Sequence, residues 1–182
     1  EHTCFFGGME QVDRERSLIQ FRNSSQRTLL ATDLAARGID IPGLDYIVHY
    51  EMPPREEEFT HRNGRTARMN ADGSAICIKG KNDKIPDYAR GIKIKEIKAG
   101  TKIPKNKWKT LFVSGGRRDK ISKGDIAGLF IKKGNLEGGE LGVIELKNDC
   151  AFVAVSSAKA DDICYKLNNE RLKKKKVRVR KI

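Results

Sequence analysis

The chain has 182 residues, which suits one large domain or two small ones, and a formal net charge of +13. No apolar run approaches the roughly 18 residues that a membrane span needs, and the first residues lack the basic-then-apolar pattern of a secretion signal. The four cysteines are dispersed, with no CxxC pair and no histidine at ligand spacing. This composition argues against a membrane protein, a disulfide-rich secreted protein and a metal site, and we expect a protein of the reducing cytoplasm.

The charge changes sign along the chain. Residues 1–78 carry nine basic residues, all arginine, against twelve acidic ones, a net charge of −3. Residues 79–110 and residues 111–182 each have a net charge of +8. A strongly basic second half predicts binding to a polyanion, because each neutralised phosphate releases condensed counterions. A solvated, lysine-rich surface is the alternative.

The first segment alternates helix and strand patterns. We expect an amphipathic helix over 10–23 and a second helix that opens on three glutamates at 56–58 and runs towards Arg68. Short apolar runs predict three strands, at 27–32, 45–50 and 73–78. Strands separated by helices indicate a parallel, doubly wound sheet. Further along, residues 92–97 alternate like an edge strand within a basic extension and linker.

The pattern restarts at Lys109 as a compact unit. Six elements are expected, namely strands at 110–114, 141–146, 150–155 and 176–180 and helices at 123–132 and 158–167. This is the split β-α-β order, β-α-β-β-α-β, of an RRM-like domain. The sequence therefore predicts an α/β protein with three parts: a parallel-sheet domain over 1–80, a linker over 81–108 and a small second domain over 109–182.

Three strings in the first segment occur together in a known order. Residues 31–40, ATDLAARGID, resemble motif V of DEAD-box RNA helicases, and residues 61–68, HRNGRTAR, resemble motif VI. Upstream, Gln11 to Arg14 matches the QxxR of motif IVa. The resemblance implies the second RecA-like domain of such a helicase, with its first strand and the whole first domain missing. The 182 residues contain no GxxxxGK[ST] phosphate loop and no DEAD sequence, so we expect this segment to be inactive alone.

The resemblance assigns ATP-handling roles to four residues. Arg65 and Arg68, three apart on one expected helical face, match the arginine fingers that act on the γ-phosphate. Asp40 matches the residue that accepts a hydrogen bond from the ATP ribose, with Gly38 allowing close backbone approach. Mg²⁺ would be held mainly by the missing domain. The alternatives are a surface arginine pair and a turn-forming aspartate.

RNA-binding and coupling roles follow from the same resemblance. The residues matching contacts to the RNA phosphodiester backbone are Gln11, Arg14, Thr32, Arg37 and Gly38. His61 matches the motif VI histidine that couples the two RecA-like domains, although a lone histidine is more often structural. For Arg14 the alternative is an ion pair with a neighbouring glutamate. One motif VI position departs from the pattern, since Asn63 stands where the family usually has an apolar residue.

The second domain offers two candidate RNA surfaces. Phe112 fits the RNP2 pattern of RRM domains and Phe152 survives from a degraded RNP1, so each could stack on a base or simply pack. Residues 115–126, GGRRDKISKGDI, resemble a signature of the DbpA group of DEAD-box helicases, which grip a hairpin of large-subunit ribosomal RNA. That resemblance implies that the RNA-facing cations are Arg117, Arg118 and Lys120.

Together these observations indicate the C-terminal part of an ATP-dependent RNA helicase that acts in ribosome assembly. A general RNA chaperone with a non-specific basic tail is the alternative, and a simple RNA-binding module is a third reading.

Overall fold

The computed structural model describes residues 2–33, 41, 44–66, 73–96, 100 and 104–182. It divides into two compact units, one made of Glu1–Ala36 with Ile103–Ile182 and the other of Arg37–Lys102. Every strand pair in the first 80 residues is parallel, whereas the sheet after residue 107 is antiparallel. The α/β class predicted from the sequence is therefore confirmed. No helix among the described residues is long and apolar enough to cross a membrane.

The chain begins with a β-α-β arrangement. Strand β1 (Thr3–Phe5) pairs in parallel with β2 (Leu29–Ala31), and helix α1 (Gln11–Arg22) connects them. The helix is anchored to β1 because Thr3 Oγ1 donates a 2.8 Å hydrogen bond to Ser17 Oγ, and Ile19 is fully buried. The sequence does not predict β1, since three residues are too few for an alternating pattern to be recognised.

The second unit holds the next parallel pair. Strand β3 (Tyr46–His49) pairs with β4 (Ser74–Cys77), and helix α3 (Glu56–Asn63) lies between them in sequence. A short 3₁₀ helix, η1 (Asp87–Ala89), follows. The edge strand predicted over 92–97 is wrong for its described residues, because residues 92–96 are exposed and have no regular structure. Alternation of isoleucine and lysine was a misleading signal there, since none of the described strands pairs with residues 92–96.

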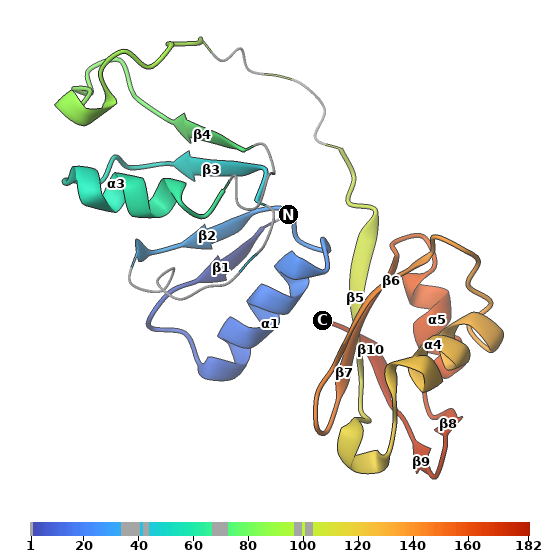
Figure 1. Ribbon diagram of the computed structural model, residues 1–182. Coiled ribbons are helices and arrows are strands. Elements are labelled where there is room, and N and C mark those ends of the chain that lie inside the picture. The colour runs from blue at the N-terminus through green and yellow to red at the C-terminus, as the bar shows by residue number, and fades with distance from the viewer. Residues whose placement is uncertain (1, 34–40, 42–43, 67–72, 97–99, 101–103) are drawn as a thin grey trace. The chain divides into compact units, whose positions relative to one another are not determined.

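From Trp108 onward the chain forms one antiparallel sheet with two helices on one face (Figure 1). The strand order is β10-β5-β7-β6. The main elements are β5 (Trp108–Val113), α4 (Lys123–Lys132), β6 (Leu141–Leu146), β7 (Ala151–Ser156), α5 (Ala160–Leu167) and β10 (Val179–Lys181). This is the predicted β-α-β-β-α-β order, and the helix over 123–132 has the predicted bounds.

The core of this domain lies between the sheet and its two helices. Alternate residues of β5, Leu111 and Val113, face Ile126 and Phe130 of α4 and Ile163 of α5, and all five are fully buried. Helix α4 starts where it does because Ser122 and the third helical residue cap each other reciprocally. Burial of this apolar cluster is the main stabilising contribution to the domain.

The last predicted strand, over 176–180, is divided in the structure. Its first residue belongs to a two-stranded hairpin, β8 (Arg171–Leu172) with β9 (Lys175–Lys176), and only residues from Val179 onward join the main sheet as β10. Val177, fully buried between the two pieces, donates its backbone N–H to the Glu170 carbonyl and so extends the backbone pairing of the hairpin. A short 3₁₀ helix, η2 (Arg117–Asp119), joins β5 to α4.

Candidate nucleic-acid interface

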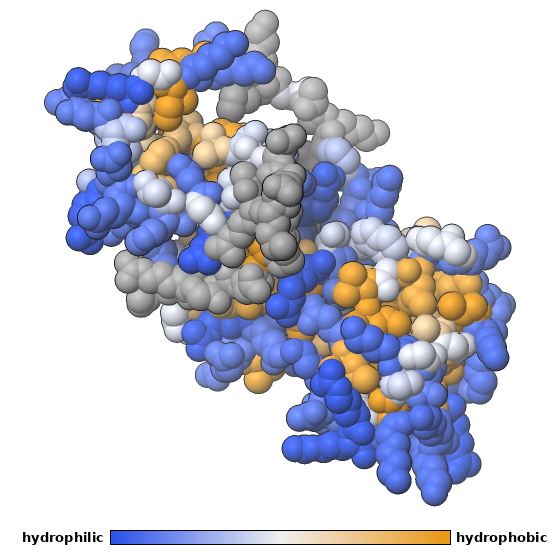
Figure 2. Space-filling view, in the orientation of Figure 1, coloured by the Kyte–Doolittle hydropathy of each residue, from blue (hydrophilic) through white to orange (hydrophobic). Residues whose placement is uncertain are grey.

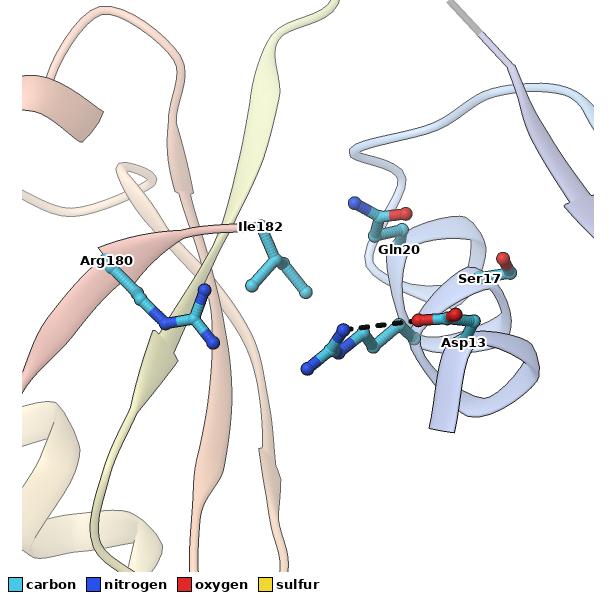
Figure 3. Close-up of a pocket in the computed structure, with 6 residues that line it drawn as sticks. Asp13, Ser17, Gln20, Arg180 and Ile182 are labelled. Carbon is cyan, nitrogen blue, oxygen red and sulfur yellow. Dashed lines mark hydrogen bonds and ion pairs between the residues drawn. The ribbon is translucent and has the colours of Figure 1, made fainter. Parts of the chain in front are cut away.

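The motif IVa residues lie on the first turns of α1. Gln11 is exposed and Arg14 is half-buried one turn later. The ion pair on this helix forms at a different arginine, since Arg16 Nη1 donates to Asp13 Oδ1 at 3.2 Å (Figure 3). Within the described part of the chain, Arg14 has no ion pair with a glutamate, and its buried Nε lacks a hydrogen-bond partner. The alternative role for Arg14, a helix-surface ion pair, therefore finds no partner there.

Motif V begins directly after β2. Thr32 is exposed, and its backbone N–H donates to the Phe5 carbonyl at 3.3 Å, so this N–H is already used within the domain. The other predicted residues of this motif, Arg37, Gly38 and Asp40, lie outside the described residues.

Helix α3 ends within motif VI, earlier than predicted. Helix α3 ends at Asn63, so Arg65 lies in a turn and not on a helical face, which corrects the expected helix to residue 68. The reason is that Thr66 turns back to the preceding strand segment, where its Oγ1 donates to the Leu44 carbonyl and the two residues form a parallel bridge. Arg65 is half-buried, with its N–H donating to Arg62 O at 3.1 Å. Arg68 lies outside the described residues.

His61 occupies the exposed side of α3. It borders a shallow surface hollow together with Thr60 and two glutamates of the same helix. Its imidazole is thus accessible from solvent and is not part of the core.

Asn63, the departure from the motif VI pattern, has a partner in the structure. Its Oδ1 lies 2.8 Å from Nε2 of His49, a fully buried residue at the end of β3. The same imidazole packs on Phe59, with ring centroids 4.7 Å apart, and its Nδ1 lies 3.4 Å from Arg62 Nη1. Sequence reasoning missed this pair, although a histidine on an apolar strand and an asparagine at an apolar helix position were its available signals.

The loop between β5 and α4 carries the three predicted cations. Arg117, Arg118 and Lys120 are all exposed, and no ion pair to any of them is found within residues 104–182. Their backbone is tied to the turn between β6 and β7, since Arg117 N donates to Lys147 O at 3.0 Å and Arg118 N to Asn148 O at 2.8 Å. The cationic side chains therefore project from a fixed backbone.

Gly116 makes that docking possible. A Cβ at this position would lie 2.5 Å from the Asn148 carbonyl, which is far too close. Its φ of −146° is accessible to any residue, so glycine is required for close approach and not for backbone conformation. Its N–H donates to Asp119 Oδ2 at 3.1 Å, and Lys175 Nζ contacts the same carboxylate oxygen at 2.8 Å. These contacts, the lysine first, hold the pKa of Asp119 below its usual value.

The two aromatic residues of the sheet contact one another. Phe112 and Phe152 are direct neighbours across β5 and β7, with ring centroids 5.8 Å apart in an edge-to-face arrangement. The Arg180 guanidinium lies 5.0 Å from the Phe112 ring centroid, and Figure 3 shows this side chain extending from β10. Phe152 is buried. The two rings therefore pack against each other, and Phe112 remains half-buried.

Among the described residues no group of three or more His, Cys, Asp or Glu side chains is arranged to hold a metal ion. The four cysteines are free thiols, and burial raises the pKa of Cys150 to about 11.

Comparison with known proteins identifies both halves of the chain. Residues 1–70 match the family model of the helicase conserved C-terminal domain, and residues 110–181 match that of the DbpA RNA binding domain. The ATP-dependent RNA helicase DbpA of Escherichia coli is 34% identical over 187 residues, covering 96% of this chain and 40% of that protein. DbpA of Bacillus subtilis is 28% identical, with coverages of 96% and 43%. The crystal structure of the yeast DEAD-box splicing factor Prp28 aligns with 42% of this chain and 17% of its own at 35% identity, with a TM-score of 0.41.

The chain therefore combines a RecA-like helicase C-terminal domain with an RRM-like RNA-binding domain. It belongs to the DbpA-like DEAD-box helicases and corresponds to their C-terminal part. It spans about two fifths of the length of the two DbpA proteins that it matches.

Proposed function

We propose that the protein to which this chain belongs is an ATP-dependent RNA helicase that remodels a hairpin of large-subunit ribosomal RNA during ribosome assembly in the cytoplasm. The chain supplies the second RecA-like domain and a targeting domain for that work. The observation that carries the proposal is the cationic loop of residues 117–120, three exposed cations on a backbone fixed by the β6–β7 turn. A preorganised cationic loop loses little entropy when it binds RNA.

ATP is the proposed energy source, and its γ-phosphate is the group that would be transferred to water. Arg65 and Arg68 would stabilise the charge that develops on the phosphoryl oxygens, with Mg²⁺ neutralising charge from the other RecA-like domain. Asp40 would bind the ribose, and Gly38 would let the backbone approach the nucleotide. Of these four residues the structure describes Arg65, which lies in a turn after α3.

The motor domain would hold RNA without reading its sequence. Gln11 and Thr32 are exposed, as contact with a phosphodiester backbone requires, and the buried Arg14 Nε has no protein acceptor in the described part of the chain. Arg37 would join them from motif V, and His61 would couple RNA binding to the other RecA-like domain. Backbone contacts of this kind position a protein on RNA and carry no sequence code.

Specificity is assigned to the cationic loop ahead of the sheet aromatics. Phe112 already contacts Arg180 and the edge of Phe152, and Phe152 is buried, so a base would have to displace these contacts in order to stack. Arg117, Arg118 and Lys120 have donors that suit phosphate or the edge of a guanine.

A salt titration tests this assignment. Binding of the chain to a large-subunit ribosomal RNA hairpin and to an unrelated hairpin of equal length would be measured as salt rises. A targeting domain keeps a large ratio between its affinities for the two hairpins as salt rises. If Arg117 contacts a base edge, Arg117→Ala should reduce the difference in binding free energy between the two hairpins by about 1–3 kcal/mol. Equal affinities at every salt concentration would instead indicate a general RNA chaperone. Loss of hairpin binding on Phe112→Ala alone would return specificity to the sheet.

A further inference from the structure

The hairpin β8–β9 contains four consecutive lysines, residues 173–176, and two of them form ion pairs with aspartates of the same domain. Lys175 Nζ lies 2.8 Å from Asp119 Oδ2, and Lys173 Nζ lies 2.7 Å from Asp125 Oδ2 and donates to the Lys120 carbonyl at 2.6 Å. Both carboxylates also cap backbone N–H groups, at Gly116 and at Ser122 respectively. The hairpin is therefore bound to the start of α4 and to the cationic loop of residues 117–120.

The other two lysines of the run form no ion pair among the described residues. Lys174 and Lys176 are exposed, and neither forms an ion pair within the described residues of the domain; the same holds for Arg171. The four lysines thus divide in strict alternation into a bound pair and a solvent-facing pair. The alternation follows from the hairpin, because successive side chains of a strand point to opposite faces, so that one pair of lysines faces the domain and the other pair faces solvent.

The hairpin also carries two unfavourable features. Arg171 pairs directly with Lys176 in the antiparallel ladder, which places like charges opposite one another. Lys173, in the turn, has a φ of +54°, in the left-handed region that non-glycine residues seldom adopt. Neither feature improves the packing of the domain. An anion bound between Arg171 and Lys176 would turn their repulsion into a shared attraction.

The position of the hairpin makes RNA the fitting anion. The two lysine–aspartate contacts place it beside the loop that bears Arg117, Arg118 and Lys120. Among the described residues, six cations without an ion pair therefore flank one end of the domain, three from the loop and three from the hairpin. Figure 2 shows that the end carrying β8 and β9 is hydrophilic. An extended row of lysines and arginines matches the regular negative charge of a nucleic-acid backbone, and arginine can bind phosphate through two parallel hydrogen bonds.

We propose that the hairpin β8–β9 is a second RNA-backbone contact of this domain, in which Arg171, Lys174 and Lys176 bind phosphates. Lys173 and Lys175 act as positioning residues that lock the hairpin to the cationic loop, so that loop and hairpin grip one RNA together. The proposal rests on the proposed function of residues 109–182 as the RNA-binding part of the protein. It extends the binding surface beyond the loop to an element that the sequence does not predict.

Two double variants of the intact chain separate the two kinds of lysine. Each would be titrated with the ribosomal RNA hairpin over a range of salt concentrations and unfolded in urea. Lys174→Ala with Lys176→Ala should lower affinity and reduce the salt slope by about one to two units, with no loss in the unfolding midpoint. Lys173→Ala with Lys175→Ala removes the same charge but breaks the two contacts with Asp125 and Asp119. This variant should therefore lower the urea midpoint of unfolding, and its affinity should keep more of the wild-type dependence on salt.

A matched control removes two cations from the other end of the sheet. Lys107 precedes β5 and Lys159 precedes α5, and neither has an ion pair within residues 104–182. Lys107→Ala with Lys159→Ala should leave the slope nearly unchanged. An equal fall in slope for this control would show diffuse attraction and overturn the proposal. So would wild-type binding by the Lys174→Ala, Lys176→Ala variant.

A further variant distinguishes RNA binding by the domain as a whole from RNA binding by the hairpin β8–β9. If Arg117→Ala with Lys120→Ala weakens hairpin binding while the Lys174→Ala, Lys176→Ala variant binds normally, the domain binds RNA and only the hairpin contact is wrong. If none of these variants changes binding, the proposed function of the domain fails as well.

Discussion

The contacts of His49 define which of its nitrogens carries the proton. Arg62 can only donate, so Nδ1 is the acceptor at 3.4 Å and the Nε2–H donates to Asn63 Oδ1 at 2.8 Å. Both ring nitrogens thus have a partner while the imidazole packs against Phe59. This pairing explains why motif VI tolerates an asparagine where the family usually has an apolar residue, since an apolar side chain would leave a buried N–H without an acceptor.

A stability measurement tests the pair. We expect Asn63→Ala to lower the free energy of unfolding by about 1–3 kcal/mol, because the buried Nε2–H of His49 loses its acceptor. The measurement is urea unfolding of the chain. Arg55→Ala is the control, since it breaks the exposed Arg55–Glu58 ion pair on the same helix and should cost little. Equal effects from both variants would show that the buried hydrogen bond is unimportant.

Of the four residues proposed to act on ATP, Arg65 is the one that the structure describes. Replacing it with alanine in the full-length protein should reduce ATP turnover roughly a hundredfold or more, because transition-state charge would lose a cation. RNA affinity should barely change, which separates a role in hydrolysis from a role in binding. Turnover would be followed as phosphate release at saturating RNA. A variant with near-normal turnover would remove Arg65 from the finger role.

At the scale of elements, α4 shows how a short sequence signal fixes a helix start. Ser122 Oγ accepts from the Asp125 N–H at 3.1 Å, while Asp125 Oδ2 accepts from the Ser122 N–H at 2.8 Å. Ser122→Ala should lower the free energy of unfolding by about 1 kcal/mol. The measurement is thermal or urea unfolding followed by helical circular dichroism. A Ser122→Thr variant, which keeps the hydroxyl at the cap, should retain most of the stability, and a similar loss in both would argue against the cap.

The same cap predicts a dependence on pH. The contact with Lys173 first, and then the contacts with Ser122, lower the pKa of Asp125 from 3.8 to about 2. A carboxylate with a lowered pKa stabilises the folded state above its unfolded pKa, and this contribution is lost as pH falls through the folded pKa. Stability should therefore decline between about pH 4 and pH 2. Removing the lysine in Lys173→Met should weaken that decline, and an unchanged acid profile would contradict the assignment.

The elements also show what a sequence pattern can and cannot predict. The helix over 123–132 and the strand over 141–146 have their predicted bounds, because a capping residue marks the helix locally and a short apolar run marks the strand. Strand β1 and the hairpin β8–β9 were missed, since each depends on pairing with a partner and is only two or three residues long per strand. Helix α3 ended early because a distant residue, Leu44, binds Thr66.

For the whole molecule, local sequence signals predicted some features of the candidate site, whereas features that depend on contacts between distant segments were not predicted. Motif strings predicted the site residues and both domain types, because those strings are local and specific, and the family matches confirm the domain types. They could not reveal how the cationic loop is held, since its backbone bonds to residues 147–148 and its aspartate bonds to Lys175 join segments far apart in sequence. Nor could they reveal that the RNP-like aromatics contact one another and Arg180.

The division of charge leads to a prediction about where specificity resides. Residues 1–78 have a net charge of −3 and residues 111–182 one of +8, and the C-terminal domain has its own continuous core. A fragment of residues 105–182 should therefore fold by itself and bind the ribosomal RNA hairpin nearly as tightly as the whole chain. It should also keep the preference for that hairpin over an unrelated one, because the cationic loop and the hairpin β8–β9 are both retained.

The comparison is best made by titrating each RNA with the fragment and with the whole chain at two salt concentrations. Electrostatic attraction alone would give the fragment similar affinity for both RNAs and a steep loss of each as salt rises. Direct contacts to base edges would preserve the affinity ratio when the absolute affinities fall. If the fragment binds both RNAs equally while the whole chain discriminates, then specificity requires the RecA-like domain. In that case the cationic loop and the hairpin β8–β9 supply attraction without recognition.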